Sequence, residues 1–288
     1  MKKLLLILVI MIAAPISANA AVCNYGCVEP YDLTSGCARF LSSATGQNFL
    51  AKKIAGSILK KQIKKSVDSD LKIKIDSYSI RDLKAGRFKS LEISGKNLNA
   101  DGVYLSELEL KTLCNFNYII PDEKNNTITF KEAFPLSFKA VISDDDLNKT
   151  MKTVGYDRVI EDLNKLGGKY GLFKILSAQT KVKNDRFFYM LRVTVPFYKP
   201  VYEVVISSDL TVKNGVIKFE DTKLINNSFT TDLSKLSYVI NYLNPLDYSL
   251  QILENKDARL KLKDVSIENN KIIVDGTVTV PKDIVTER

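Results

Sequence analysis

The chain has 288 residues, with 42 Lys and Arg against 33 Asp and Glu, a formal net charge of +9 and no histidine. Without histidine, Ser-His-Asp and Cys-His catalysis, histidine-ligated zinc and the usual proton shuttle near neutral pH are excluded. The length suffices for one large domain or two similar halves around a substantial core. A modestly basic balance suits an anionic surface, but it is also common in exported domains that bind nothing acidic.

Residues 1–20 have the three parts of a secretory signal peptide. Two lysines precede an apolar run from Leu4 to Ala14, and Ala18-Asn19-Ala20 supplies the small residues of a cleavage site. The apolar run is too short to cross a bilayer, for which roughly 20 residues are needed. We therefore expect a mature chain that begins at Ala21 and is exported to the periplasm or the extracellular space.

Four cysteines follow, three of them in a segment at residues 21–46: Cys23, Cys27, Cys37 and the distant Cys114. In an exported protein an even number of cysteines favours disulfides, and four cysteines allow three pairings. Zinc ligation by thiolates is the alternative, but the C-x3-C-x9-C spacing is no recognised zinc-finger pattern. We predict disulfides of unknown pairing that fix this segment to a strand ending near Cys114, and we expect no metal and no cofactor.

From Gln47 to Val67, apolar residues recur at helical spacing and lysines fill the other positions. This pattern predicts a basic amphipathic helix. Either its apolar face contacts lipid and its lysines meet anionic head groups, or the helix packs on the protein core and its lysines are simply solvated. The candidate lipid contacts are Leu50, Ile54, Ile58, Leu59 and Ile63, and the candidate head-group or membrane-docking residues are Lys52, Lys53, Lys60, Lys61 and Lys64.

The apolar period then changes to two, which predicts strands. Residues 71–75 form the first, and Gly86 marks a turn before further strands. In the stretch 103–110, apolar residues are odd-numbered up to Leu105 and even-numbered from Leu108. Because a shift of one residue exchanges the two faces of a strand, either a β-bulge lies at Ser106-Glu107 or the chain turns there. We favour the bulge.

Polar residues 122–126 predict a hairpin between strands near 119–120 and 128–130, and another strand follows at 134–142. Ser143 is then a predicted helix N-cap, because Asp144 to Asp146 place negative charge in the first turn. The helix is expected to reach Gly167-Gly168, with Gly155 as a break.

Strands near 171–182, 187–195, 201–213 and 216–224 follow, joined at Asn184-Asp185 and Asn214-Gly215. A helix is predicted at about 231–242. The last strands are predicted near 247–253, 258–267 and 271–280, and the final two meet at a turn at Asn269-Asn270. We thus expect an α+β fold of elongated, mostly antiparallel curved sheets with amphipathic helices packed on them. Residues 47–288 would form one domain with two similar halves, about 47–168 and 169–288.

Other motifs give little support for catalysis or nucleic-acid binding. Asp144 to Asp146 are consecutive in a helix start, so their side chains point about 100° apart and do not converge on a substrate atom. No calcium-binding loop follows them. Nucleic-acid binding is not expected, because arginines interleaved with stacking aromatics are missing and the chain is exported.

The stretch from Gly86 to Met151 resembles the LmeA-like phospholipid-binding family of bacterial envelope proteins. The similarity is carried by Gly86-x-Phe88, Leu91-x-Ile93, Gly102-Val103-x-Leu105-x-x-Leu108-x-Leu110 and Ala140-x-Ile142-Ser143-x-x-Asp146-Leu147-Asn148. The run Ala258-x-Leu260-x-Leu262-x-x-Val265-x-Ile267 is similar to the closing strands of that family. Residues 23–37 and 113–131 depart from the family pattern and inherit nothing from it.

The resemblance implies phospholipid binding in the cell envelope without an enzymatic step, and a tubular lipid-binding architecture of the BPI/SMP-like kind. Phospholipid or a membrane surface would be the partner. Two alternatives remain open: a structural or protein-interaction module with a sealed core, and an enzyme using carboxylates or lysine on envelope glycolipids. The patterning does not separate an open cleft from a filled core, because both require one apolar face per strand.

Overall fold

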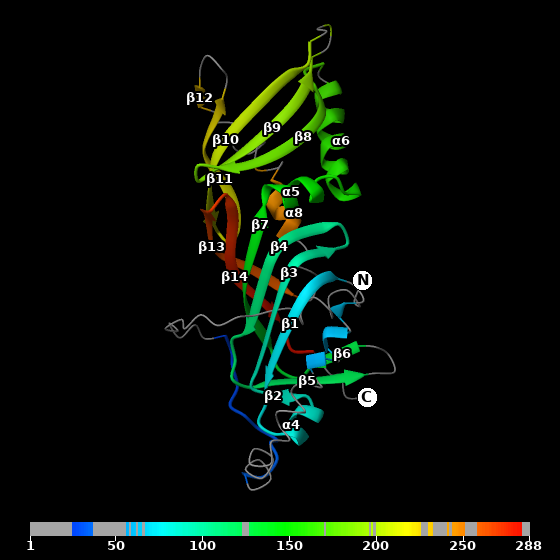
Figure 1. Ribbon diagram of the computed structural model, residues 1–288, viewed down its shortest axis with the longest axis vertical. Coiled ribbons are helices and arrows are strands. Elements are labelled where there is room, and N and C mark those ends of the chain that lie inside the picture. Colours follow the sequence, from blue (N-terminus) through cyan, green and yellow to red (C-terminus); the bar gives the residue numbers. More distant parts are fainter. Residues whose placement is uncertain are drawn as a thin grey trace.

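The computed structural model describes residues 25–36, 56–57, 59–61, 63–64, 67–122, 127–169, 171–195, 197, 200–225, 230–232, 241, 244–250 and 258–283. The molecule is elongated, with one large sheet in its lower two thirds and a second sheet above it (Figure 1). Among the described residues, no helix is both long and apolar enough to span a bilayer.

The larger sheet has six strands in the order β1-β3-β4-β7-β14-β13, and every neighbouring pair is antiparallel. Along most of each strand buried and more exposed residues alternate, which confirms the predicted half-buried strands. The strands are β1 (Asp68–Asp76), β3 (Ser90–Ala100), β4 (Val103–Thr112), β7 (Phe134–Ser143), β13 (Arg259–Glu268) and β14 (Lys271–Val280).

The second sheet has five strands in the order β12-β11-β10-β9-β8, and a small third sheet has the order β2-β5-β6. The five strands are β8 (Lys174–Lys183), β9 (Arg186–Thr194), β10 (Tyr202–Lys213), β11 (Val216–Ile225) and β12 (Thr230–Asp232). The small sheet consists of β2 (Arg87–Phe88), β5 (Asn117–Asp122) and β6 (Thr127–Phe130), and its β5–β6 pair is the predicted hairpin.

The C-terminal hairpin does not lie with the other strands of the predicted second half. Instead β14 pairs with β7 from Lys271↔Ser143 to Val280↔Phe134, and β13 forms the edge of the six-stranded sheet. An unpaired β7 edge would leave a row of backbone donors and acceptors without partners, and β14 supplies them. The boundary expected near residue 168 therefore does not separate the two large sheets.

The predicted bulge at Ser106-Glu107 is absent, and the chain does not turn there. The buried set does change parity in β4, from Leu105 to Leu108. It changes at the same level in β3, from Gly95 to Leu98, and the pairing between the two strands shows no register shift. In both strands the buried side chains therefore switch from one face of the sheet to the other at the same level, which is where β4 begins to pair with β7.

The helix start at Ser143 is confirmed, and it joins the two sheets. Ser143 caps α5 (Asp144–Thr150) in a capping box with Asp146. Oδ2 of Asp146 accepts hydrogen bonds from Ser143 N at 2.9 Å, Ser143 Oγ at 2.6 Å and Ser106 Oγ of β4 at 2.5 Å. On the other side, Asn148 exchanges two hydrogen bonds with the backbone of Thr180 in β8, at 2.8 and 2.9 Å. The helix ends at Met151, and α6 (Val154–Lys169) is separate.

The three predicted hairpin turns of the second half are confirmed. Asn184-Asp185, Asn214-Gly215 and Asn269-Asn270 all have positive φ, which asparagine, aspartate and glycine tolerate best. Each of these pairs joins adjacent antiparallel strands.

Near the end of the chain one predicted strand is wrong, and one predicted helix begins later than expected. The strand expected near 247–253 begins inside α8 (Pro245–Leu250), where Leu246 and Leu250, four residues apart, are both buried. Thr231 lies in β12 and not at a helix start. Most of the helix predicted at about 231–242 lies outside the described residues, and Asn241 is helical.

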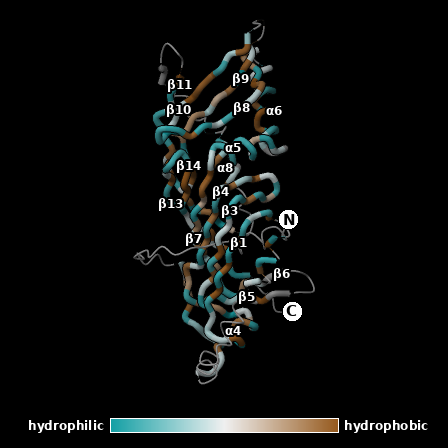
Figure 2. Tube along the Cα trace, viewed as in Figure 1, coloured by the Kyte–Doolittle hydropathy of each residue, from teal (hydrophilic) through white to brown (hydrophobic). Residues whose placement is uncertain are grey.

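The buried apolar side chains form one cluster that passes from the six-stranded sheet into the five-stranded sheet. It includes Ile93 of β3, Leu147 of α5, Phe187 of β9 and Ile272 of β14. Figure 2 shows hydrophobic segments along the strands of both sheets. Phe187 and Phe219 stack with ring centroids 5.1 Å apart inside the upper sheet. The interior is thus apolar over most of the long axis.

Two adjacent glycines of α6 give a direct test of its packing. A Cβ on Gly167 would lie 2.4 Å from the backbone oxygen of Phe173, whereas a Cβ on Gly168 would meet nothing within 4 Å. Gly167→Ala should lower the free energy of unfolding by about 1–3 kcal/mol through overpacking. Gly168→Ala should raise it by up to about 1 kcal/mol, because alanine favours helix. Chemical denaturation of both variants measures this, and equal effects would contradict the placement of the helix.

Candidate functional site

The structure describes part of the predicted basic helix, and the described part lies on the six-stranded sheet. Residues 56–57, 59–61 and 63 are helical. A Cβ on Gly56 would lie 3.7 Å from the backbone oxygen of Ile73 in β1. Ile63 is fully buried in the core cluster, and Leu59 packs against it half-buried. The other candidate lipid contacts, Leu50, Ile54 and Ile58, lie outside the residues whose side chains are described.

The lysines of this helix lie toward solvent. Lys61 and Lys64 are exposed and Lys60 is half-buried. Lys52 and Lys53 lie outside the described residues. Where it can be followed, the helix therefore presents its apolar residues to protein and its lysines to solvent, an arrangement that leaves the lysines accessible to anionic groups.

The N-terminal segment is joined covalently to the six-stranded sheet. A disulfide links Cys27 to Cys114, which lies just after β4, and their Cα atoms are 5.5 Å apart. This confirms the predicted attachment of the segment near Cys114; Cys23 and Cys37 lie outside the described residues. A disulfide is typical of proteins that fold in an oxidising compartment, which agrees with export.

A buried carboxylate holds the same segment in place. Asp82, in the short helix α4 (Ile80–Lys84), is fully buried. Its Oδ1 accepts a hydrogen bond from Thr34 N at 2.9 Å, and its Oδ2 accepts from Thr34 Oγ1 at 2.8 Å and Ser79 Oγ at 2.5 Å. Arg87 Nε lies 3.7 Å from Oδ1, and Arg87 also pairs with Asp32 of the segment.

This network stabilises the ionised form of Asp82. Burial alone would raise the pKa of its carboxyl group, but the hydrogen bonds from Ser79 and Thr34 and the charge of Arg87 outweigh burial and lower that pKa. The predicted cysteine-bearing segment is therefore held by a disulfide and a buried charge together. Spacing alone could not reveal the second contact, because Thr34 and Asp82 are 48 positions apart.

Two other carboxyl groups, both on the six-stranded sheet, have raised pKa values. Burial raises the pKa of Glu109 in β4 and that of Asp275 in β14. Lys139 of β7 lies between them in register and opposes both shifts. All three are half-buried residues on the face of the sheet opposite the core, so they do not line an enclosed space. Within the described ranges, no group of three metal-ligating side chains comes together.

Tyr156 of α6 and Tyr189 of β9 form a buried pair with their hydroxyl oxygens 2.5 Å apart. Burial raises the pKa of Tyr156 above its ordinary value and that of Tyr189 to about 12. Both hydroxyls therefore stay protonated near neutral pH. Their hydroxyl contact joins α6 to the five-stranded sheet.

One surface was missed by the sequence analysis. Large apolar side chains are exposed at the upper end of the five-stranded sheet, where β8 and β10 begin and β9 ends; we call this the apolar tip. Its members are Leu172, Leu176, Val195, Phe197, Val201 and Tyr202. The run Val195-Pro-Phe-Tyr-Lys-Pro-Val-Tyr202 was the available signal, because an apolar segment between two strands is unusual for a solvated turn.

The buried charge predicts a pH dependence of stability. Because the folded-state pKa of Asp82 lies below its unfolded value of about 3.9, its contribution is present above that pH and is lost as the pH falls through the folded-state pKa. Asp82→Asn should cost about 1–3 kcal/mol at pH 7. It should also flatten the fall in stability below pH 4, whereas Asp101→Asn on an exposed turn should change neither. Urea denaturation between pH 2.5 and 7 measures both effects. An acid transition of Asp82→Asn as steep as that of the unaltered protein would refute the assignment, since other carboxyl groups with lowered pKa values, such as Glu92, titrate in both proteins.

Comparisons with known proteins identify no relative of this chain. No protein-family model matches the chain, and no curated protein and no solved structure matches it. The resemblance of residues 86–151 to the LmeA-like family therefore stays a prediction.

Proposed function

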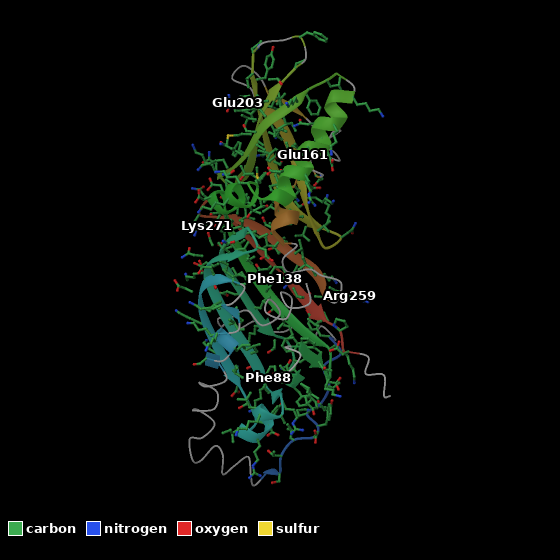
Figure 3. The ribbon with its side chains drawn as sticks, turned by 90° about the vertical axis from the view of Figure 1, so that its right-hand side faces the viewer. Phe88, Phe138, Glu161, Glu203, Arg259 and Lys271 are labelled. Atoms are coloured by element: carbon green, nitrogen blue, oxygen red, sulfur yellow. A yellow bond between two sulfur atoms is a disulfide. The ribbon has the colours of Figure 1, made fainter. Side chains whose placement is uncertain are left out.

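We propose that the protein is an exported phospholipid-binding protein of the cell envelope that holds acyl chains in its apolar interior and transfers lipid between membranes. The observation that carries the proposal is the continuous apolar cluster along the long axis of the molecule. Figure 3 marks that axis, with Phe88 near the lower end, Phe138 near the middle and Glu203 near the upper end. The disulfide supports export, and the LmeA-like pattern supports lipid as the ligand.

Magnitudes indicate which contacts would determine affinity. Burial of one acyl chain of about 16 carbons is worth up to roughly 13 kcal/mol at about 0.8 kcal/mol per methylene, before entropy costs. A lysine near an anionic head group contributes about 1 kcal/mol and less at high salt. Enclosure of the chains would therefore dominate affinity. Lys60, Lys61 and Lys64 would select head groups or aid docking.

The basic helix is the proposed cover of the interior. Ile63 and Leu59 pack on the core cluster, and Gly56 allows the helix to approach β1 closely. An acyl chain that enters here would replace the contacts of Ile63 with core side chains, so the helix would move outward as lipid binds. In this proposal the architecture is of the tubular lipid-binding kind, with a helix against a curved sheet.

The second candidate is a structural or protein-interaction module with a sealed core. It is favoured by the complete burial of Leu105, Leu108, Leu147 and Ile272 against other protein side chains. Complete burial of this kind is expected for a core that is filled by protein side chains. In that case the lysines on the outside are solvated and have no ligand.

Native mass spectrometry and lipid extraction of the exported protein test the proposal directly. We expect phospholipid to copurify, or to bind when vesicles are added, since the interior would be more stable around acyl chains than exposed to water. Protein that is recovered free of lipid and takes none up from vesicles would contradict lipid binding.

The same measurement on Ala140→Leu separates the two candidates. Ala140 is fully buried in the core-facing side of β7. In a sealed core the added atoms should cost about 1–3 kcal/mol of stability. In an interior with room for acyl chains, the variant should keep its stability and retain less lipid.

A further prediction compares the two faces of the basic helix. Ile63→Ala should lower both lipid retention and stability, the latter by about 2–5 kcal/mol, because it removes buried methyl groups. Lys61→Ala should change stability little and weaken binding to anionic vesicles by about 1 kcal/mol at low salt. Thermal melting and lipid quantification of both variants provide the measurement. Equal losses of lipid would show that charge, and not enclosure, controls affinity.

A further inference from the structure

The apolar tip combines exposed side chains from two strands, β8 and β10, and from two loops at one end of the molecule. Phe197 is 106% exposed, Leu172 58%, Leu176 47%, Val201 44%, Tyr202 42% and Val195 36%. Tyr202 of β10 pairs with Val193 of β9, and Lys174 of β8 pairs with Thr194 of β9. The register thus brings the end of β9 beside the starts of β8 and β10, at the top of the molecule in Figure 1.

The opposite end of this sheet is built differently. Its turns are Asn184-Asp185 and Asn214-Gly215, and the exposed large apolar residue described near them is Val216, at 40%. Polar turns of this kind are the usual way to end a hairpin in water. The concentration of Leu, Val, Phe and Tyr at the tip is therefore a local property of one end of the sheet.

Basic side chains surround the tip. Lys169 at the end of α6, Lys174 of β8 and Arg192 of β9 are all exposed. Among the described acidic residues of these strand ends, Glu203 stands opposite Arg192 in register, and Figure 3 shows it at this end of the molecule. The net charge of these side chains around the tip is positive. This charge favours a negatively charged binding surface over an uncharged one.

We propose that the apolar tip inserts shallowly into the interface of an anionic phospholipid bilayer. Aromatic and aliphatic side chains beside lysine and arginine are the composition that binds at the boundary between head groups and acyl chains. The side chains of the tip lie on strand ends and loops. They can therefore enter a fluid membrane interface in many orientations, whereas a protein partner would need a pocket of complementary shape. The long axis of the molecule then points away from the membrane.

This inference does not require the protein to carry a lipid, and it uses a different surface from the basic helix. That helix lies on the six-stranded sheet, and the tip belongs to the five-stranded sheet. A molecule anchored by its tip would hold the helix away from that bilayer, where its lysines remain free to meet a second anionic surface.

Tryptophan fluorescence tests the insertion, because the chain contains no tryptophan. Phe197→Trp creates a single reporter in the tip, and Val216→Trp creates a matched reporter at the opposite end. With vesicles of phosphatidylglycerol and phosphatidylcholine, the emission of Phe197→Trp should shift to shorter wavelength and be quenched by brominated acyl chains. The emission of Val216→Trp should change in neither respect. An unchanged spectrum of Phe197→Trp would overturn the proposal.

Vesicle cosedimentation gives the quantitative test. The double variant Phe197→Ser with Leu172→Ser should bind these vesicles at least roughly 10-fold more weakly, because two large apolar side chains no longer enter the interface. Val216→Ser should bind like the unaltered protein. Lys174→Glu should weaken binding at low salt and much less at high salt. Melting curves identify any variant that is not folded.

Two outcomes would refute tip insertion while the proteins stay folded. One is equal vesicle binding by the double variant and the unaltered protein. The other is self-association that the double variant abolishes, together with no binding to vesicles, which would identify the tip as a contact between copies of this chain. Lipid content is measured on the same samples, so lipid-free protein that still inserts through Phe197 would contradict the proposed lipid binding and support this inference.

Discussion

The hydrogen bonds that the carboxylate of Asp146 accepts fix the start of α5, the helix that lies between the two large sheets. One of its oxygens accepts hydrogen bonds from Ser143, which caps α5, and from Ser106 of β4. The helix that begins there buries Leu147 completely and binds the backbone of Thr180 in β8 through Asn148. This helix start therefore connects the six-stranded sheet to β8 of the five-stranded sheet, and β10 and β11 contact β13 as a second connection. The apolar interior continues from one sheet to the other.

The two ends of the chain complete the six-stranded sheet from opposite directions. The C-terminal hairpin covers the edge of β7, and the N-terminal segment is held at the other end by the Cys27–Cys114 disulfide and by Asp82. Both attachments join residues far apart in sequence, and the disulfide, being covalent, also restricts the unfolded chain. In the sequence, the strands of the five-stranded sheet lie between β7 and the C-terminal hairpin. The end of this sheet that is farther from the six-stranded sheet carries the exposed apolar tip.

Local patterns predicted most of the elements correctly. Alternation identified the strands near 71–75, 134–142 and 258–280, the Asn-containing pairs identified three turns, and Ser143 with its aspartates identified a helix start. The errors arose where a distant partner determines the outcome. The strand expected near 247–253 starts as α8 because burial of Leu246 and Leu250 on one side favours a helix, and the face change at 105–108 is shared with β3 instead of forming a bulge.

The sequence by itself determined most of the strands, the hairpin turns and the exclusion of histidine chemistry, because these depend on residue type and short spacing. The export signal at residues 1–20 stays a prediction. Tertiary structure alone decided which strands share a sheet, which cysteine pairs with Cys27, and that Ile63 is buried while Phe197 is exposed. The physical reason is that the identity of an apolar residue does not specify which other residues will pack against it. Burial is settled only when strands from distant parts of the chain meet.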